Sequence, residues 1–209
     1  MTELYLSAVT AGNLKNFELS ISKNGIYGII GRNGAGKSTL FTIINEELRL
    51  KSGQISGFSR VVYVPNLDIF DENLTANDYM AVLSKDEQQK STKLIKKFSA
   101  DRFFSGKIKT YSLGMKEIFA FIMTISLESD LIIIDELMNG MDNSMRKLAF
   151  SYLQLISKDK IVLLTSHILE EVFQFSDKVY LLNHSELHEI KDLKDAILKI
   201  NDSPVFAEL

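Results

Sequence analysis

Nine consecutive residues combine glycines, one lysine and two hydroxyl side chains in a spacing that can hold a chain of phosphates. They are Gly31, Arg32, Asn33, Gly34, Ala35, Gly36, Lys37, Ser38 and Thr39, and they fit the pattern G-x-x-x-x-G-K-[ST]. Glycines let the backbone approach phosphate oxygens closely, because they have no Cβ and accept a positive φ. Backbone N–H groups of such a loop, and of a helix that begins there, point at the bound anion. We therefore expect Lys37 to reach the β- and γ-phosphates of a nucleotide and Ser38 to ligate Mg²⁺.

Two acidic residues, Asp135 and Glu136, follow a short apolar run at residues 131–134. A buried strand that ends here would carry Asp135 toward the phosphate loop, where a carboxylate can hold Mg²⁺ or its water. Glu136, on the other side of the strand, could then orient or deprotonate an attacking water molecule. Two acids after an apolar run can also simply mark a loop. Together with the phosphate loop, however, they predict an enzyme that hydrolyses a nucleotide.

Short apolar runs alternate with amphipathic segments along the chain, and these elements must position the side chains above. A buried strand at residues 26–30 would lead into the phosphate loop, and a helix at residues 37–48 would follow it. Further strands are expected at residues 17–21, 61–64, 131–134, 161–164 and 179–182, and helices at residues 144–156, 168–173 and 191–200. This alternation is typical of an α/β fold with a largely parallel sheet.

Residues 66–128 interrupt the alternation, because they show helical periods and no convincing strand. We expect one domain, residues 1–209, in which this helical subdomain is inserted between core segments 1–65 and 129–209. Within it, residues 85–109 carry eight basic and three acidic side chains. Such a surplus fits either a solvated helix face or an electrostatic docking surface.

Composition excludes several classes of protein. The chain has 209 residues and no Cys, so disulfide scaffolds, thiol catalysis and Cys-rich zinc sites do not apply. A net charge of −3 argues against a strongly electrostatic nucleic-acid binder, and we expect no specific nucleic-acid partner. The apolar runs are too short to span a bilayer, and the first residues do not look like a secretory signal. We therefore expect a soluble, cytoplasmic protein whose contact with a membrane would be peripheral.

Three further motifs stand in a fixed order around the two acids. They are residues 111–116 (YSLGMK), residues 139–142 (NGMD) and residues 164–167 (LTSH), of which the first lies about twenty residues before Asp135. With these motifs the chain resembles the ATP-binding cassette (ABC) family, the nucleotide-binding subunits of ABC transporters, over roughly residues 4–190. The resemblance implies a P-loop NTPase core with a largely parallel sheet, an N-terminal antiparallel β-part and an inserted helical subdomain.

The resemblance also implies how the site residues act. Two subunits would sandwich two molecules of ATP with Mg²⁺, and Ser112 and Gly114 of one chain would cap the γ-phosphate held by Lys37 of the other. Glu136 would act as the base. His167 would hold the γ-phosphate and the water in line.

Asp142 would link the two sites across the interface between the subunits. ATP would close the dimer, of two identical or paralogous subunits, and hydrolysis would release it. This cycle would drive a separate transmembrane permease, so the subunit would lie on the inner face of the cell membrane and meet the membrane only through that permease. The YSxGM form of residues 111–115 resembles exporters of drugs or antimicrobial peptides.

The chain departs from the family pattern at several positions. Asn66 stands where the family has Gln, so it keeps an amide for the nucleotide or Mg²⁺ but is one methylene shorter. Leu137 and Met138 replace a Pro and a small hydroxyl residue, and Glu117 and Ile118 replace the common Gln-Arg. No aromatic residue clearly occupies the adenine-stacking position ahead of the phosphate loop. The charged and polar groups needed for hydrolysis are kept, so we expect an active ATPase.

Two other functions stay open on these residues. One is a soluble ABC-type ATPase that acts on ribosomes or nucleic acid, and the other is a nucleotide-binding regulator with weak hydrolysis. Relatives of the first kind usually carry two cassettes or a long coiled coil, which this sequence lacks. The basic residues 85–109 have no interleaved aromatic side chains that could stack on bases.

Overall fold

Six strands form the central sheet of the computed structural model, which describes residues 2–202. Their order is β5-β6-β7-β3-β8-β9. The strands are β3 (Gly25–Ile30), β5 (Val61–Tyr63), β6 (Leu131–Asp135), β7 (Ile161–Thr165), β8 (Lys178–Asn183) and β9 (Glu186–Ile190). All neighbours pair in parallel except β9, which runs antiparallel to β8. Every residue of β3 and β7 is buried, as expected for parallel strands that are covered on both faces.

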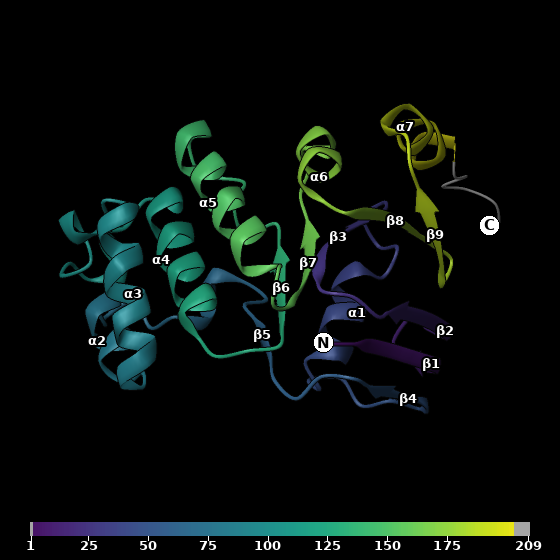
Figure 1. Ribbon diagram of the computed structural model, residues 1–209, viewed down its shortest axis with the longest axis horizontal. Coiled ribbons are helices and arrows are strands. Elements are labelled where there is room, and N and C mark those ends of the chain that lie inside the picture. The colour runs from purple at the N-terminus through teal and green to yellow at the C-terminus, as the bar shows by residue number, and fades with distance from the viewer. Residues whose placement is uncertain (1, 203–209) are drawn as a thin grey trace.

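Alternate residues of these strands pack into two separate layers. On one face, Ile132 and Val162 pack with residues of α5 (Asn143–Ile156), and on the other, Ile133 and Leu163 pack with residues of α1 (Lys37–Ile44). This follows from the period of two along a strand. In Figure 1, α5 and α6 (Leu169–Phe175) accordingly lie on one side of the sheet and α1 on the other.

A second, antiparallel sheet lies beside α1 and has the order β2-β1-β4. It consists of β1 (Leu4–Ala11), β2 (Leu14–Ile21) and β4 (Ser52–Ser56). The turn between β1 and β2 has two residues, Gly12 and Asn13, and the alternating apolar residues of β2 face the core shared with α1. Phe17, an aromatic residue of β2, is completely buried there.

Helices fill the chain between β5 and β6 and form one end of the molecule (Figure 1). They are α2 (Ala76–Ala81), α3 (Lys85–Lys97) and α4 (Leu113–Ser126), with the short 3₁₀ turns η1 (Leu67–Ile69), η2 (Ala100–Arg102) and η3 (Ile108–Thr110). Capping boxes at Thr75 and Ser84 begin α2 and α3, because each hydroxyl and the carboxylate three residues later satisfy backbone N–H groups. The lysines of α3 lie mostly on its exposed side.

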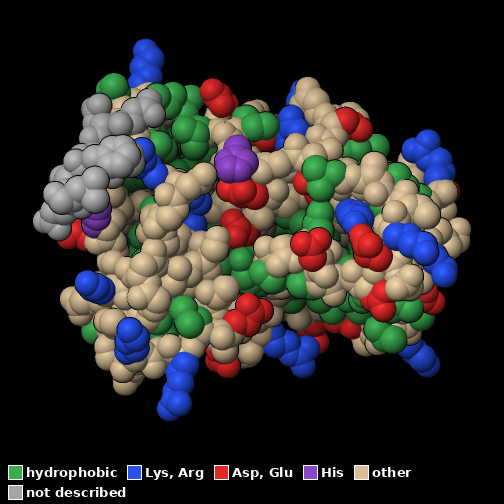
Figure 2. All heavy atoms as spheres, turned by 180° about the vertical axis from the view of Figure 1, so that it is seen from behind, with side chains coloured by type: hydrophobic (Ala, Val, Ile, Leu, Met, Phe, Trp, Pro, Cys, Tyr) green, Lys and Arg blue, Asp and Glu red, His purple; other side chains and the backbone are tan. Residues whose placement is uncertain are grey.

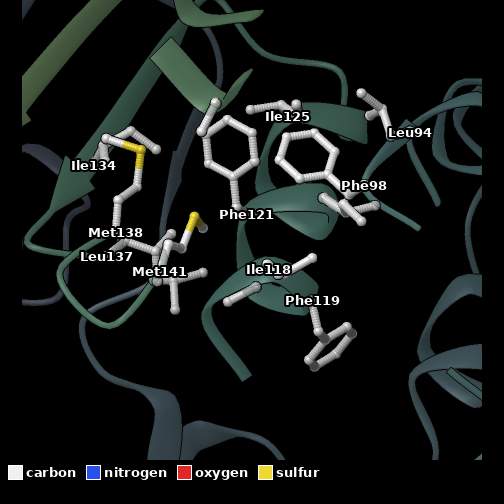
Figure 3. Close-up of a cluster of buried hydrophobic side chains, with 14 of the residues drawn as sticks. Leu94, Phe98, Ile118, Phe119, Phe121, Ile125, Ile134, Leu137, Met138 and Met141 are labelled. Carbon is white, nitrogen blue, oxygen red and sulfur yellow. The ribbon is translucent and has the colours of Figure 1, made fainter. Parts of the chain in front are cut away.

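The apolar faces of α3 and α4 join this helical end to the α/β core. Figure 3 shows Phe98, the C-cap residue of α3, beside Phe121 of α4, with Leu137 and Met141 from the loop after β6 close by. All four side chains belong to one buried cluster. The fold class expected from the sequence is therefore confirmed, with a mostly parallel sheet, an antiparallel part and inserted helices.

Several boundaries differ from the sequence expectation. The helix expected at residues 37–48 ends at Ile44, since Asn45 terminates it and Glu46 takes a φ of 60°. The strand expected at residues 61–64 ends at Tyr63, two residues before Pro65. The expected C-terminal helix is α7 (Leu193–Asp202), whose Ala196 is buried near α6 and β9.

Candidate nucleotide-binding site

The phosphate loop, residues 31–39, connects the carboxyl end of β3 to the first turn of α1. Two of its glycines are required by the backbone. Gly31 has a φ of 154°, and a Cβ on it would lie 2.6 Å from the carbonyl oxygen of Leu182. Gly36, which precedes α1, has a φ of 111°, and a Cβ there would lie 2.8 Å from Cδ2 of Leu14. A side chain at either position would push the loop away from its neighbours.

The β1–β2 turn supports the top of the loop. The side-chain amide of Asn13 donates a hydrogen bond to the carbonyl oxygen of Gly34 at 3.1 Å. A Cβ on Gly12 would lie 2.7 Å from Cγ2 of Thr39, so the turn touches α1 as well. The β1–β2 turn therefore contacts both the phosphate loop and the first turn of α1.

Lys37 places its ammonium group inside the curve of the loop. Its Nζ donates hydrogen bonds to the carbonyl oxygens of Gly31 at 2.8 Å and Arg32 at 3.2 Å. Burial lowers the pKa of Lys37 from its ordinary value of 10.5, and the nearby carboxylates of Glu136 and Asp135 partly oppose this shift. A half-buried cation beside backbone N–H groups is the arrangement that phosphate oxygens require.

Asp135 accepts hydrogen bonds from three hydroxyl groups. Thr165 donates to Oδ1 at 2.6 Å, and Tyr63 and Ser38 donate to Oδ2 at 3.1 and 3.4 Å. Burial, with the adjacent Asp135 charge, strongly raises the pKa of Tyr63, so its hydroxyl stays protonated and donates. These ligands fit Mg²⁺, a hard cation that prefers oxygen ligands. The hydroxyl oxygen of Ser38 and the carboxylate oxygen Oδ2 of Asp135 lie close enough together to bind one ion.

Tyr63 and Thr165 were not predicted as site residues. Thr165 stands in the LTSH motif and Tyr63 in an expected strand, but the sequence does not say that β5 and β7 flank β6. In the sheet, Thr165 lies directly opposite Asp135, and Tyr63 ends the strand on the other side. Polar residues at the ends of neighbouring parallel strands would have been the signal, once the strand order was known.

Glu136 and His167 lie close together at this same edge of the sheet. Nε2 of His167 is 2.8 Å from Oε2 of Glu136, so the imidazole ring and the carboxylate are in close contact. Glu136 has a φ of 56°, which is rare for a residue with a side chain. Its N–H donates to Oγ1 of Thr165 at 3.0 Å, so the strained backbone is held by the same threonine that binds Asp135.

Two adjoining open pockets surround these groups, with volumes of about 420 and 430 Å³. Asn33, Lys37 and Glu136 line both of them. The first is also lined by Asn13, Gly34, Gly36, Ser38, Thr39, Pro65 and Asp135, and the second by Gly31, Arg32, Ser166, His167, Leu169 and Ile200 among others. Figure 2 shows a face of the molecule with Asp and Glu side chains near its middle beside a histidine, while many Lys and Arg side chains project from its edge.

The remaining predicted site residues line neither pocket. Asn66 is exposed, and its side-chain oxygen accepts the N–H of Asp68 at 2.9 Å as the cap of η1. Ser112 is the N-cap of α4 and Gly114 lies in its first turn. Asp142 is the N-cap of α5, where the N–H of Met145 and the hydroxyl of Ser144 hold its pKa below the ordinary value. Ala35 packs against the core beside α1.

A family model described as ABC transporter matches residues 14–139, which is more than half of the chain. The chain belongs to the ABC transporter family. It is 30% identical over 187 residues to the ABC transporter ATP-binding protein YcbN of Bacillus subtilis, and the match covers 79% of this chain and 60% of YcbN. It is 29% identical over 180 residues to the lantibiotic transport ATP-binding protein SrtF of Streptococcus pyogenes, covering 78% of this chain and 77% of SrtF.

Solved structures agree with the fold of this ABC chain. A structure titled as the ATP binding subunit of an ABC transporter superposes with a TM-score of 0.82 at 22% identity, covering 97% of this chain and 95% of that one. The curated relative YcbN is longer, and the chain spans 60% of it. Within residues 2–202, no helix is long and apolar enough to cross a membrane.

Proposed function

We propose that this ABC chain binds and hydrolyses ATP and that the energy drives a separate transmembrane permease. The observation that carries the proposal is the convergence of Lys37, Asp135, Glu136 and His167 on two adjoining pockets at the phosphate loop. Asp135 ends β6, Glu136 follows it, His167 lies just after β7, and Lys37 begins α1 after the loop that leaves β3; these three strands are adjacent in the sheet. Parallel sheets bind ligands at this edge, outside the carboxyl ends of their strands.

Each group has a task in this proposal that follows from its chemistry. Lys37 and the N–H groups of residues 31–39 bind the phosphates, and Ser38 and Asp135 would hold Mg²⁺. When bound, that ion would neutralise part of the phosphate charge. Tyr63 and Thr165 keep Asp135 in place by donating to its two oxygens.

The pair at the end of β6 and β7 would handle the attacking water. Glu136 would take a proton from it, since an ionised carboxylate can accept one at neutral pH. Nε2 of His167 lies 2.8 Å from Oε2 of Glu136 and so restricts where this carboxylate can lie. In the nucleotide-bound protein we expect Nε2 of His167 to contact the γ-phosphate and keep it in line with the water.

A second copy would complete the site. Ser112 and Gly114 stand at the start of α4, whose free N–H groups and dipole favour a negative charge, yet they line neither pocket of their own chain. We infer that they meet the γ-phosphate held by a partner subunit, with Asp142 at the contact between the two chains. ATP would then hold the dimer together.

Export is the direction of transport that the relatives favour. SrtF is named for lantibiotic transport, and further relatives in Bacillus cereus and Lactococcus lactis are named teichoic acids export ATP-binding proteins. The chain would stand on the inner face of the cell membrane through its permease. Co-expression tests this part, because capture of the chain by a polytopic membrane protein supports it and recovery with ribosomes or nucleic acid contradicts it.

Phosphate release tests hydrolysis directly. With Mg²⁺ and ATP, the wild type should release phosphate, and Glu136→Gln should be at least about 100-fold slower while it still binds ATP. Equal rates for the two proteins would remove Glu136 from the role of base. A wild type that binds ATP but releases no phosphate would favour a nucleotide-binding regulator.

A further inference from the structure

Glu117 is a buried carboxylate that the proposed mechanism does not use. It lies on α4, one turn after the signature segment (residues 111–116) has begun the helix, and only 4% of its surface is exposed. Both of its oxygens accept the N–H of Gly140, at 2.9 and 2.7 Å. Gly140 belongs to the D-loop (residues 139–142), which precedes α5. One side chain thus joins two motifs that lie far apart in sequence.

The backbones of the two motifs also touch each other. A Cβ on Gly114 would lie 2.8 Å from the carbonyl oxygen of Gly140. A Cβ on Gly140 would lie 2.8 Å from Cγ and Cδ2 of Leu113 and 3.1 Å from Oε1 of Glu117. Glycine at positions 114 and 140 therefore lets the two backbones approach each other. The hydrogen bond from the N–H of Gly140 to Glu117 fixes their relative position, and such a bond stabilises most where water is excluded.

Apolar packing surrounds this contact. Leu137, Met138 and Met141 are buried in the same cluster as Ile118 and Phe121 of α4. Figure 3 shows Met141 near Ile118 and Phe121. A carboxylate in such surroundings is costly unless it is hydrogen-bonded, so its presence here indicates a specific contact with the D-loop.

The D-loop is also connected to the segment that carries His167. Nη1 of Arg146 donates to the carbonyl oxygen of Met141 at 2.9 Å, and its Nε donates to Oε1 of Glu171 at 2.7 Å. Glu171 lies on α6, which begins two residues after His167. The side chains of Arg146 and Glu171 are both largely buried, so this pair is not a loose surface contact.

We propose that Glu117 is a positioning residue that locks the signature segment and the D-loop into one rigid unit, and that a second copy of this chain meets this unit as a single surface. Leu113, 59% exposed beside Gly140, lies on that surface. The inference rests on the proposed ATP-dependent dimer. Without the Glu117 contact, Ser112 and Asp142 would have to be ordered separately when the dimer closes, at a cost in affinity between the subunits.

Dimerisation and nucleotide binding, measured side by side, test this role. In a Glu136→Gln background with Mg²⁺ and ATP, Glu117→Leu should weaken the dimer by about 10-fold or more, while ATP binding to each chain changes by less than about 3-fold. Glu117→Gln should restore most of the dimer affinity, since its amide oxygen can accept the same N–H. Glu128→Gln, with a 72% exposed side chain just after α4, removes the same charge and should change neither quantity.

The outcomes separate this inference from the proposed function. If the Glu136→Gln parent dimerises and Glu117→Leu dimerises equally well, the positioning role is wrong and the proposed function stands. If the parent binds ATP but never dimerises, both are wrong. Loss of ATP binding together with the dimer would show a merely structural role and contradict the inference. Should Glu117→Leu fail to fold, Gly140→Ala perturbs the same contact from the loop side and should also weaken the dimer about 10-fold with ATP binding kept.

Discussion

Nε2 of His167 lies 2.8 Å from Oε2 of Glu136, although the two residues are 31 positions apart in sequence. The contact exists because β6 and β7 are neighbours in the sheet and both end at the phosphate loop. It places the imidazole ring against the carboxylate in a pocket that also holds the Lys37 ammonium group. A base with a fixed orientation needs no reorganisation when it meets its water.

Replacing His167 should therefore slow hydrolysis without preventing binding. We expect His167→Ala to lower the rate of phosphate release by about 100-fold or more and to change ATP affinity by less than about 3-fold, because the phosphate loop is intact. The control is His188→Ala, since His188 makes a similar contact with Glu186, at 3.1 Å, on the exposed strand β9. That variant should hydrolyse ATP normally. Equal losses in the two variants would show that the effect of His167 is not specific.

Thr165 should stabilise the fold as well as the site. Its hydroxyl donates to Asp135 and accepts from the N–H of Glu136, and Thr165→Val loses both bonds inside the protein. We expect the free energy of unfolding to fall by about 1–3 kcal/mol, since the half-buried Asp135 carboxylate loses its shortest hydrogen bond and the N–H of Glu136 loses one of its two acceptors. Chemical denaturation measures it, and the Mg²⁺ concentration needed for phosphate release should rise.

Thr124→Val is the matched control for that experiment. Thr124 is completely buried on α4, and its hydroxyl has no hydrogen-bond partner. The same substitution should therefore leave the free energy of unfolding unchanged or raise it slightly. An equal loss in both variants would mean that shape, rather than hydrogen bonding, determines the effect at Thr165.

Glu117 should make stability depend on pH in a defined direction. Burial raises its pKa above the ordinary value of 4.5, opposed by the N–H groups of Gly140 and Met141 and by the charge of Arg146. A raised folded-state pKa contributes stability that is fully present below the unfolded-state pKa and is lost as pH rises through the folded-state pKa.

The free energy of unfolding of the wild type, relative to that of Glu117→Gln, should therefore fall as pH rises from about 4.5 toward neutrality. Denaturant unfolding of both proteins at a series of pH values gives this difference, and groups common to both cancel. A difference that stays constant with pH, or that grows in favour of the wild type, would contradict the assignment.

Strong local signals made most of the core predictable. The phosphate loop, β3, β6 and β7 combine apolar runs with the glycines and acids that end them, so their local structure could be expected, although their order in the sheet could not. β4 could not be predicted as a strand, because its residues Ser-Gly-Gln-Ile-Ser are mostly exposed and show no apolar period. It forms a strand by pairing with β1, which no local pattern encodes.

The parts of the site that depend on strand order or on long-range packing were missed for the same reason. Tyr63 and Thr165 become neighbours of Asp135 only when β5 and β7 flank β6. Glu117 looked like a departure from a motif, and only the packing of α4 on the D-loop shows that its carboxylate has a partner. Asn66 was expected at the nucleotide, whereas its amide oxygen caps η1 and would have to leave that contact to reach the pocket.

Light scattering of the Glu136→Gln protein tests the central claim most directly, namely that two copies of this chain close around ATP. With Mg²⁺ and ATP the protein should change from monomer to dimer, and Ser112→Arg in the same background should abolish the dimer while leaving ATP bound to each chain. A protein that binds ATP and remains a monomer at every concentration would contradict the account, as would a dimer that Ser112→Arg leaves intact.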